Sequence, residues 1–241
     1  MFAATAMLVT VDGSALSGDA AGLKGQSRIE EPNRAQRTIV RRTAEARATV
    51  PDLELDTEVG METCLGLAAE RGCSITALLV RACALTLRDV PRANAAYRDG
   101  RFELYSRINV GVTIETEDAY AVPTVLDADR KSLPELTAEL ATLTVRAQRG
   151  ELTPPQLSGA TFTLTDLSDH GVARSSAIVT PPQAAAVVAG AIRTVPVLRD
   201  GAIVPGPVMT LTLGCDHRIL YGGRAARLLR GAADRLGTGR M

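Results

Sequence analysis

A strand that ends in a histidine, followed by a helix that two glycines open, is the most constraining feature of this sequence. Residues 207–213 alternate in polarity and include β-branched side chains, which predicts a strand. After Gly222-Gly223, the alanines and leucines of residues 224–236 recur at helical spacing. His217 is therefore expected at a strand-to-helix corner, where an imidazole can act as a base. The alternative is a half-buried structural histidine held by a backbone carbonyl.

Length and charge restrict the classes of protein that this chain can belong to. With 241 residues it is long enough for one large domain with a sizeable core. Its formal net charge is zero and it has no basic tract, so nucleic acid and membrane surfaces are not expected partners. The apolar residues 2–11 lack a preceding basic region and are too short for a membrane span. We expect residues 1–31 to form an N-terminal arm with a loose connection, and residues 32–241 to form the domain.

The cysteines and the second histidine give no sign of chemistry. Cys64, Cys73, Cys83 and Cys215 form no C-x-x-C pair, and three of them lie in apolar stretches. Buried free thiols in a reducing cytoplasm are the expectation. No glycine-rich phosphate loop and no cluster at metal-ligand spacing occurs, so neither a metal nor a tightly bound cofactor is predicted. His170 lies in a polar turn segment and is expected to have a structural role.

Helices and strands alternate irregularly along the chain, which favours an α+β fold with a mainly antiparallel or mixed sheet. Ser74 and Ser132 stand where helix N-caps are expected. The predicted helices cover residues 31–49, 61–70, 75–89, 132–148 and 222–236, with Pro32 in the first turn of the first one. The predicted strands cover residues 49–55, 101–105, 108–115, 161–167 and 207–213.

The residues around the corner histidine resemble a known signature. The catalytic domains of dihydrolipoamide acyltransferases, the E2 components of 2-oxo acid dehydrogenase complexes, carry Asp-His-Arg-x-x-Asp-Gly. Asp216, His217, Arg218 and Gly222 match this signature, and Tyr221 stands in place of its second aspartate. The sequence is thus similar to a divergent, stand-alone member of this family within the chloramphenicol acetyltransferase-like superfamily.

Further blocks carry the same resemblance in the same order, from about residue 35 to residue 236. Residues 122–133 resemble the family's Val-Pro-Val-x-x-Asp-Ala-Asp-x-x-Ser-Leu. Residues 161–167 resemble Thr-Phe-Thr-Ile-Ser-Asn-Leu, with Thr165 at the serine and Asp166 at the asparagine. The polar Asn-Asp pair usual near the start of the central helix is Thr76-Ala77 here, which weakens the case for polar substrate contacts from that helix.

The resemblance implies a fold and a set of roles. The fold is a chloramphenicol acetyltransferase-like mixed β-sheet flanked by helices, assembled as a trimer with each active site at a subunit interface. His217 would act as the base in acyl transfer between thiols. Thr165 would stabilise the oxyanion, although a threonine chosen only for its strand propensity is the alternative. The residues implied to support the active-site corner are Asp216, Arg218, Tyr221 and Gly222.

Tyr221 is the departure that matters most. The family's aspartate at this place holds the corner through a nearby positive charge, and a phenol cannot replace a carboxylate at neutral pH. We therefore expect either a different bracing of the corner or an impaired activity. A Tyr221→Asp change is expected to cost several kcal/mol, because it would bury a carboxylate without a partner.

The resemblance also implies partners that act in trans. Neither a lipoyl domain nor a subunit-binding domain fits before Arg37, and Lys24 lacks the pattern of a lipoylation site. We expect a lipoyl-domain protein as donor, CoA or a carrier protein's phosphopantetheine as the second thiol, and an E1-like decarboxylase or transketolase-like enzyme upstream, in a specialised biosynthetic pathway in the cytoplasm. Residues 237–241 are too short and polar to build a cage, which predicts a free homotrimer. A non-catalytic or weakly active E2-like core scaffold is the alternative.

Overall fold

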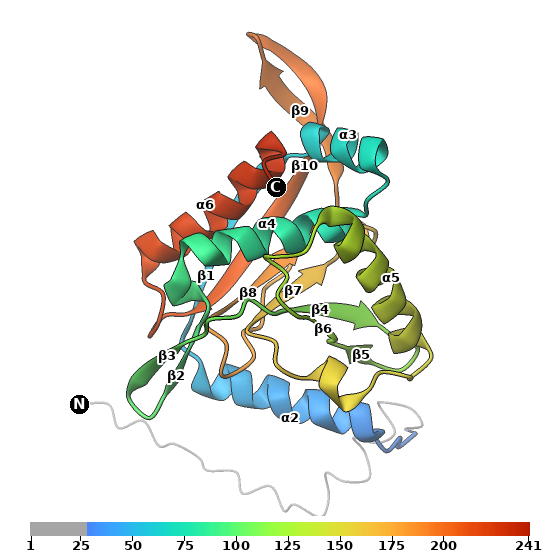
Figure 1. Cartoon of the computed structure of the whole chain (residues 1–241), viewed down its shortest axis with the longest axis vertical. Coiled ribbons are helices and arrows are strands. Elements are labelled where there is room, and N and C mark those ends of the chain that lie inside the picture. Colours follow the sequence, from blue (N-terminus) through green and yellow to red (C-terminus); the bar gives the residue numbers. More distant parts are fainter. Residues whose placement is uncertain (1–27) are drawn as a thin grey trace, which may run out of the picture. The chain divides into compact units, whose positions relative to one another are not determined.

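The computed structural model describes residues 28–241. The expected arm at residues 2–11 and Lys24 lie outside this described part. The chain divides into two units between Arg34 and Ala35. The unit from Ala35 to Met241 is built on one sheet with helices packed against it, as Figure 1 shows. The predicted α+β class is confirmed.

The sheet contains both parallel and antiparallel strand pairs. Its order is β1-β10-β8-β7-β4-β5, with β6 also pairing with β4 and β9 with β10. The pairs β4–β7 and β7–β8 are parallel, and the other pairs are antiparallel. The strands are β1 (Asp52–Gly60), β4 (Val110–Glu115), β5 (Tyr120–Ala121), β6 (Thr124–Val125), β7 (Phe162–Asp166), β8 (Ala185–Ala189), β9 (Arg193–Arg199) and β10 (Ala202–Asp216). A separate hairpin consists of β2 (Ala95–Arg98) and β3 (Arg101–Leu104).

Several features of the sheet differ from the prediction, which did not include β5, β6, β8 or β9. The last strand is longer than residues 207–213, because β10 starts at Ala202 and first pairs with β9 in a hairpin. This hairpin projects at the top of Figure 1, and Leu198 and Ile203 near its tip are 77% and 78% exposed. The strand β8 was not predicted, although all of its five residues are buried between β10 and β7.

The helices follow the predicted caps closely. The Ser74 Oγ accepts a hydrogen bond from the Ala77 amide at 3.1 Å, and Gly72 ends the preceding helix in the left-handed conformation. Pro32 precedes the first described helix instead of lying in its first turn. The helices are α2 (Arg34–Thr49), α3 (Glu62–Arg71), α4 (Ile75–Asp89), α5 (Leu133–Gln148) and α6 (Gly222–Thr238), and the short 3₁₀ turns are Pro91–Ala93 and Pro154–Leu157.

One face of the sheet carries the main hydrophobic core. α4 is buried on nearly all sides and packs against α5 and α6, which cover this face in Figure 1. The opposite face carries a smaller cluster, in which Val50, Ala177 and Val179 pack against β8. The chain approaches the sheet closely there, since a Cβ added to Gly190 would lie 2.1 Å from the Ala173 carbonyl oxygen. Glycine is therefore required at that position.

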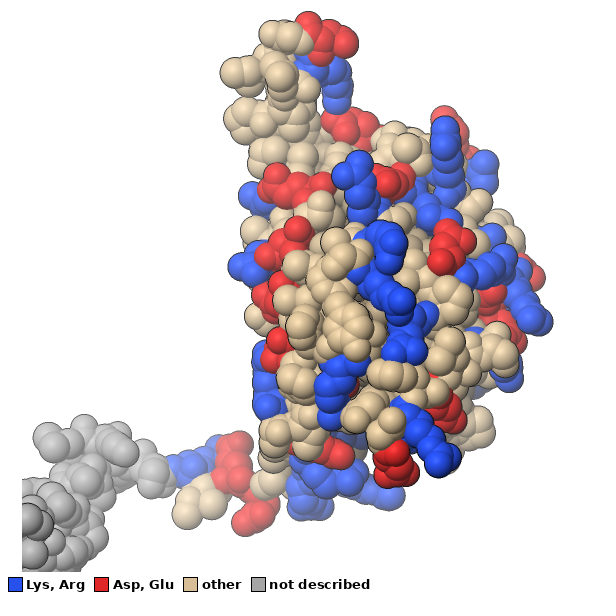
Figure 2. Space-filling view, turned by 90° about the vertical axis from the view of Figure 1, so that its left-hand side faces the viewer, with Lys and Arg blue, Asp and Glu red and all other residues tan. Residues whose placement is uncertain are grey.

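The composition and the surface of the described part add four findings. All four cysteines are free and buried, as predicted. Among residues 28–241 no single helix is long and apolar enough to cross a membrane, and α3 and α4 reach that length only as a pair bent by 114°. No group of three or more metal-ligating side chains occurs in these residues. Figure 2 shows a band of basic side chains on the side where α6 and the β2–β3 hairpin lie.

Candidate active site

His217 follows the last residue of β10 in a tight turn that leads into α6. The amides of Ile219 and Leu220 both donate to the Asp216 carbonyl oxygen at 2.9 Å, which closes the turn. The His217 amide donates to the carbonyl oxygen of Pro51 at 2.9 Å, and the Asp216 amide donates to that of Ala184 at 2.9 Å. The backbone of the corner is thus tied to chain segments on both sides of β10, and the predicted strand-to-helix corner is confirmed.

An ion pair between a buried carboxylate and a half-buried guanidinium braces the same corner. The Asp216 carboxylate is 3% exposed, and it accepts hydrogen bonds from the Arg218 amide (3.0 Å) and from the Arg218 Nε (2.9 Å) and Nη2 (2.6 Å). Hydrogen bonding to Asp216 raises the pKa of the Arg218 guanidinium above its usual value. The guanidinium also lies 4.9 Å from the centre of the Tyr97 ring. Asp216 and Arg218 therefore hold the turn from which the histidine projects.

The His217 side chain is exposed, unlike the residues on either side of it. Its imidazole makes no hydrogen bond to any residue in the described range 28–241. The ring meets the edge of the Tyr221 ring, with the centroids 6.0 Å apart and the planes at 83°. A half-buried histidine held by a backbone carbonyl is therefore not what the structure contains. The imidazole is left available to an external partner.

Tyr221 does not lie in a buried corner, so the expected penalty for an aspartate there is wrong. Its side chain is 53% exposed and it occupies the N-cap position of α6, where it makes no side-chain capping bond. An aspartate or asparagine at an N-cap accepts a hydrogen bond from the first turn of the helix. The corner is instead braced by Asp216 and Arg218, and Gly222 begins α6 with open space around it.

Thr165 lies near the end of β7 and is half-buried. Its hydroxyl is 2.9 Å from the hydroxyl of Thr113, which faces it from the neighbouring strand β4. The next residue, Asp166, accepts a hydrogen bond from the Thr76 hydroxyl at 2.7 Å, so the start of α4 does make a polar contact at this place. Thr113 was not among the predicted site residues. The alternation of residues 109–114 was the available signal, because it placed Thr113 on a regular strand.

His217 and Thr165 are far apart within one chain. Thr165 pairs with Val188 on β8, and Val188 pairs with Thr212 on β10. His217 follows Thr212 by five positions, which is about 16 Å along the strand direction, and the two strand spacings add about 10 Å across. A hydrogen bond requires about 3 Å between heavy atoms. The two predicted catalytic side chains therefore cannot act together within a single copy of the chain.

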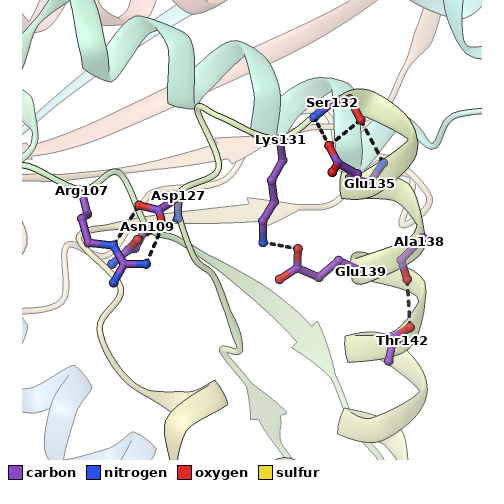
Figure 3. Close-up of polar contacts among 9 residues, drawn as sticks. All are labelled: Arg107, Asn109, Asp127, Lys131, Ser132, Glu135, Ala138, Glu139 and Thr142. Atoms are coloured by element: carbon purple, nitrogen blue, oxygen red, sulfur yellow. Dashed lines mark hydrogen bonds and ion pairs between the residues drawn. The ribbon is translucent and has the colours of Figure 1, made fainter.

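The block of residues 122–133 has a structural role in this chain. Figure 3 shows its contacts: Arg107 pairs with Asp127, the Asn109 side chain accepts from the Asp127 amide at 2.9 Å, and Ser132 forms a capping box with Glu135. Together these contacts fix the chain between β6 and α5. These contacts serve the fold, and none of them involves Thr165 or His217.

The other residues considered for chemistry are either paired or buried. His170 lies in a turn, as expected, with its Nε2 3.1 Å from a Glu115 carboxylate oxygen. Cys215 adjoins the corner, but burial raises the pKa of its thiol to about 12, with Asp216 and Asp52 adding to the effect. A thiol with such a pKa stays protonated and is not a nucleophile near neutral pH. His217 is therefore the side chain at the corner that combines an exposed imidazole, suited to act as a base near neutral pH, with the absence of a hydrogen-bond partner among residues 28–241.

The mixed sheet, the covering helices and the histidine corner define a protein of the chloramphenicol acetyltransferase-like fold. Chloramphenicol acetyltransferase itself superposes with a TM-score of 0.55 at 16% identity, covering 87% of this chain and 99% of the other, which shows the fold alone. The family model of the 2-oxoacid dehydrogenases acyltransferase (catalytic domain) matches residues 24–238. The chain belongs to this family.

Relatives and solved structures agree with this assignment. The chain is 28% identical over 207 residues to the dihydrolipoyllysine-residue acetyltransferase component of the pyruvate dehydrogenase complex of Rickettsia prowazekii, covering 82% of this chain and 51% of the other. The chain thus spans about half the length of such curated relatives. The Azotobacter vinelandii dihydrolipoamide acetyltransferase superposes with a TM-score of 0.84 at 25% identity, covering 90% of this chain and 94% of the other. Crystallographic and enzymatic investigations of the Azotobacter vinelandii enzyme addressed the role of a serine, a histidine and an asparagine in the catalytic mechanism of that enzyme.

Proposed function

We propose that this chain is an acyltransferase that moves a small acyl group between two thiols, with His217 as the general base. The observation that carries the proposal is the exposed imidazole of His217, which has no hydrogen-bond partner among residues 28–241 and projects from a turn held by the ion pair of Arg218 with the buried Asp216 carboxylate. A base must reach the proton that it removes and must keep its orientation. The backbone bonds of His217 and the Asp216–Arg218 pair meet the second requirement.

The reaction needs one proton transfer in each direction. The neutral imidazole takes the proton of the incoming thiol, and the thiolate attacks the carbonyl carbon of the thioester. The new carbon–sulfur bond gives a tetrahedral intermediate with a negatively charged oxygen. When the intermediate collapses, the bond to the departing sulfur breaks and the imidazolium returns its proton to that sulfur. No oxidant, metal or further reactant is required.

Thr165 is proposed to stabilise the oxyanion through its hydroxyl. If the Thr113 hydroxyl donates to the Thr165 oxygen, the Thr165 proton is free to point toward the substrate. The contact of 2.9 Å between the two oxygens would also fix the direction of that proton. Thr113 is then a positioning residue, because it acts on the substrate only through Thr165.

The complete site is proposed to form between two copies of the chain, within a homotrimer. The separation of the two residues in one copy, about 16 Å along the sheet and about 10 Å across it, supports this arrangement. Thr165 and His217 are 52 positions apart, and Tyr221 follows His217 by four. The serine, histidine and asparagine of the Azotobacter vinelandii enzyme have the same separations. This agreement supports the proposal that Thr165 and His217 correspond to the serine and the histidine of that enzyme.

The proposed substrates follow from the family. A lipoyl group, charged by an E1-like decarboxylase or transketolase-like enzyme, is the proposed donor, and CoA or the phosphopantetheine of an acyl carrier protein is the proposed acceptor. Both substrates present a thiol on a long, flexible arm. Such arms can enter a site between two subunits from opposite sides, and neither needs to be bound tightly by this chain.

Acyl transfer from acetyl-dihydrolipoamide to CoA tests the proposal directly. His217→Ala should reduce turnover by roughly 10²–10⁴-fold, the usual contribution of general-base assistance. His170→Ala is the matched control, since it removes the other histidine from an exposed turn and should leave turnover nearly unchanged. Equal rates for the parent and the His217→Ala variant would exclude the proposed mechanism.

A second candidate function is a scaffold core with little or no activity. Tyr221 favours it, because the family's aspartate is missing beside the histidine and the tyrosine makes no capping bond. Transfer by the parental chain that is no faster than the uncatalysed thiol exchange, under conditions where the chain assembles, would favour this second candidate.

A further inference from the structure

The exposed face of α6 carries three arginines at intervals of three residues. Arg224, Arg227 and Arg230 are all exposed, while the opposite face of the helix is buried through Ala225, Leu228, Leu229, Ala232, Ala233 and Leu236. Arg230 has only a weak ion pair with Asp234 at 3.6 Å, in which its side chain stays 82% exposed. Arg224 and Arg227 have no acidic partner within residues 28–241. This face therefore presents uncompensated positive charge.

The acidic strand next to α6 does not neutralise these arginines. The carboxylates of β1 are paired with other arginines: Glu54 and Asp56 with Arg174 at 2.8 and 2.6 Å, and Glu58 with Arg193 at 3.5 Å. The band of basic side chains in Figure 2 has acidic side chains mostly to either side of it. A protein whose net charge is zero thus concentrates positive charge on one face.

The arginines begin beside the candidate catalytic histidine. Tyr221, whose ring contacts the His217 ring, is the N-cap of α6, and the Arg224 amide donates to the Tyr221 carbonyl oxygen at 2.8 Å. From Arg224 to Arg230 the helix rises about 9 Å. A partner that contacts all three arginines would therefore have one edge at the mouth of the site.

The shape of this face fits a macromolecule better than a small anion. A bound phosphate needs donors that converge on one point, whereas these arginines spread over a convex helix surface. The groove of about 530 Å³ between α6 and β1 is lined by Arg230 but not by Arg224 or Arg227. Charges arranged in this way attract and orient an oppositely charged protein surface over a distance.

We infer that Arg224, Arg227 and Arg230 form a docking surface for an acidic carrier domain, which delivers its acyl-bearing thiol arm to His217. The inference rests on the proposed function and names the partner of the same site. The carrier domain would contact the exposed face of α6 through carboxylates around the attachment point of its arm. The pairs would be solvent-exposed, so they would raise the rate of productive encounter more than the lifetime of the complex.

The test compares two donors with the same acyl group. One is an acidic lipoyl domain that carries acetyl-dihydrolipoyl-lysine, and the other is free acetyl-dihydrolipoamide. Pantetheine serves as the acceptor because it lacks the phosphates of CoA. The test variant is Arg224→Glu with Arg227→Glu, and the control is Arg146→Glu with Arg149→Glu, which makes the same charge change on exposed residues at the end of α5.

The docking surface predicts a selective loss. For the lipoyl-domain donor at low salt, kcat/KM of the α6 variant should be at least roughly 10-fold below that of the parent. This difference in kcat/KM between variant and parent should become smaller at high salt. The free donor and the α5 control should show no such loss. An equal effect on both donors, or no effect on either, would overturn the inference. In a parallel assay with CoA in place of pantetheine, a raised KM for CoA with both donors would also overturn the inference and would assign the arginines to nucleotide phosphates.

Failure of the proposed function can be told apart from failure of docking. If the parental chain transfers acetyl groups from neither donor, the acyltransferase proposal fails. Titration of the fluorescently labelled lipoyl domain then decides the docking question. Binding that the α6 variant loses and the α5 control keeps would support the surface, and equal binding by all three proteins would overturn it.

Discussion

The N-cap position of α6 offers a sharp test of the local energetics, because Tyr221 leaves it without a side-chain cap. Tyr221→Asp would supply a carboxylate that accepts a hydrogen bond from the first turn. A good N-cap stabilises a helix by about 0.5–2 kcal/mol, and a negative charge at a helix N-terminus adds about 0.3–1 kcal/mol. The same change removes the edge contact between the Tyr221 and His217 rings, which lie 6.0 Å apart.

The cap should outweigh the lost ring contact. An aromatic pair contributes about 0.5–1.5 kcal/mol when buried, and less here because Tyr221 is 53% exposed. We therefore expect Tyr221→Asp to raise the free energy of unfolding by about 0.5–1 kcal/mol. Tyr221→Phe keeps the ring contact and should match the parent. Tyr221→Ala loses the ring and gains no cap, so it should be less stable than Tyr221→Asp by about 1–2 kcal/mol.

Urea unfolding of the four proteins at one fixed concentration measures these differences. The concentration is fixed because assembly stabilises the folded chain by mass action. The expected order of stability is the aspartate variant first, then the parent and the phenylalanine variant together, then the alanine variant. Equal stability of the aspartate and alanine variants would mean that the aspartate forms no N-cap hydrogen bond. The expected stabilisation by a cap at position 221 would then be refuted.

Three further predictions concern the site and the acid stability of the fold. Thr165→Ala should reduce turnover by roughly 10²-fold while Thr165→Ser keeps most of it, in steady-state kinetics; a change in melting temperature alone would assign the residue to packing. Arg218→Met should lower the free energy of unfolding by about 2–4 kcal/mol, because it leaves the Asp216 carboxylate buried without a partner. This range already includes a discount for the Arg218 side chain, which is 37% exposed. In the same urea measurement, adding Asp216→Asn should recover much of the lost free energy. The hydrogen bonds from Ser132 hold the pKa of Glu135 below its usual value of 4.5. The capping box therefore adds stability that is fully present above about pH 4.5 and is lost as the pH falls through the lowered pKa. Glu135→Gln should therefore flatten the acid limb of stability against pH, and an unchanged acid limb would contradict this role.

Most of the fold could be predicted from local signals. Ser74, Gly72 and Ser132 mark helix ends through backbone chemistry that acts within a few residues, and the structure confirms all three. The corner at His217 was predictable for the same reason, since the strand pattern before it and the helical pattern after it are both strong. These signals are local and do not depend on the tertiary fold.

The missed features depend on contacts between distant segments. β8 is rich in alanine, which favours no strand, and it becomes one only because β10 and β7 pair with both of its edges. Pro205 suggests an interruption, yet it lies within β10, where it pairs opposite Pro196 in the projecting hairpin. Proline is tolerated at this position because no backbone N–H is required there for a hydrogen bond between strands. The exposure of Tyr221 could not be predicted either, because it depends on how α6 packs on the sheet.

The measurement that tests the shared site most directly is complementation between two inactive variants. His217→Ala and Thr165→Ala are each expected to be nearly inactive alone. When the two are co-expressed in equal amounts and assemble at random, about one quarter of the sites combine an intact His217 from one copy with an intact Thr165 from the next. The shared site predicts about one quarter of the parental turnover from the whole population, or about one third from the mixed trimers alone, which native mass spectrometry identifies. Mixed trimers as inactive as the separate variants would contradict it.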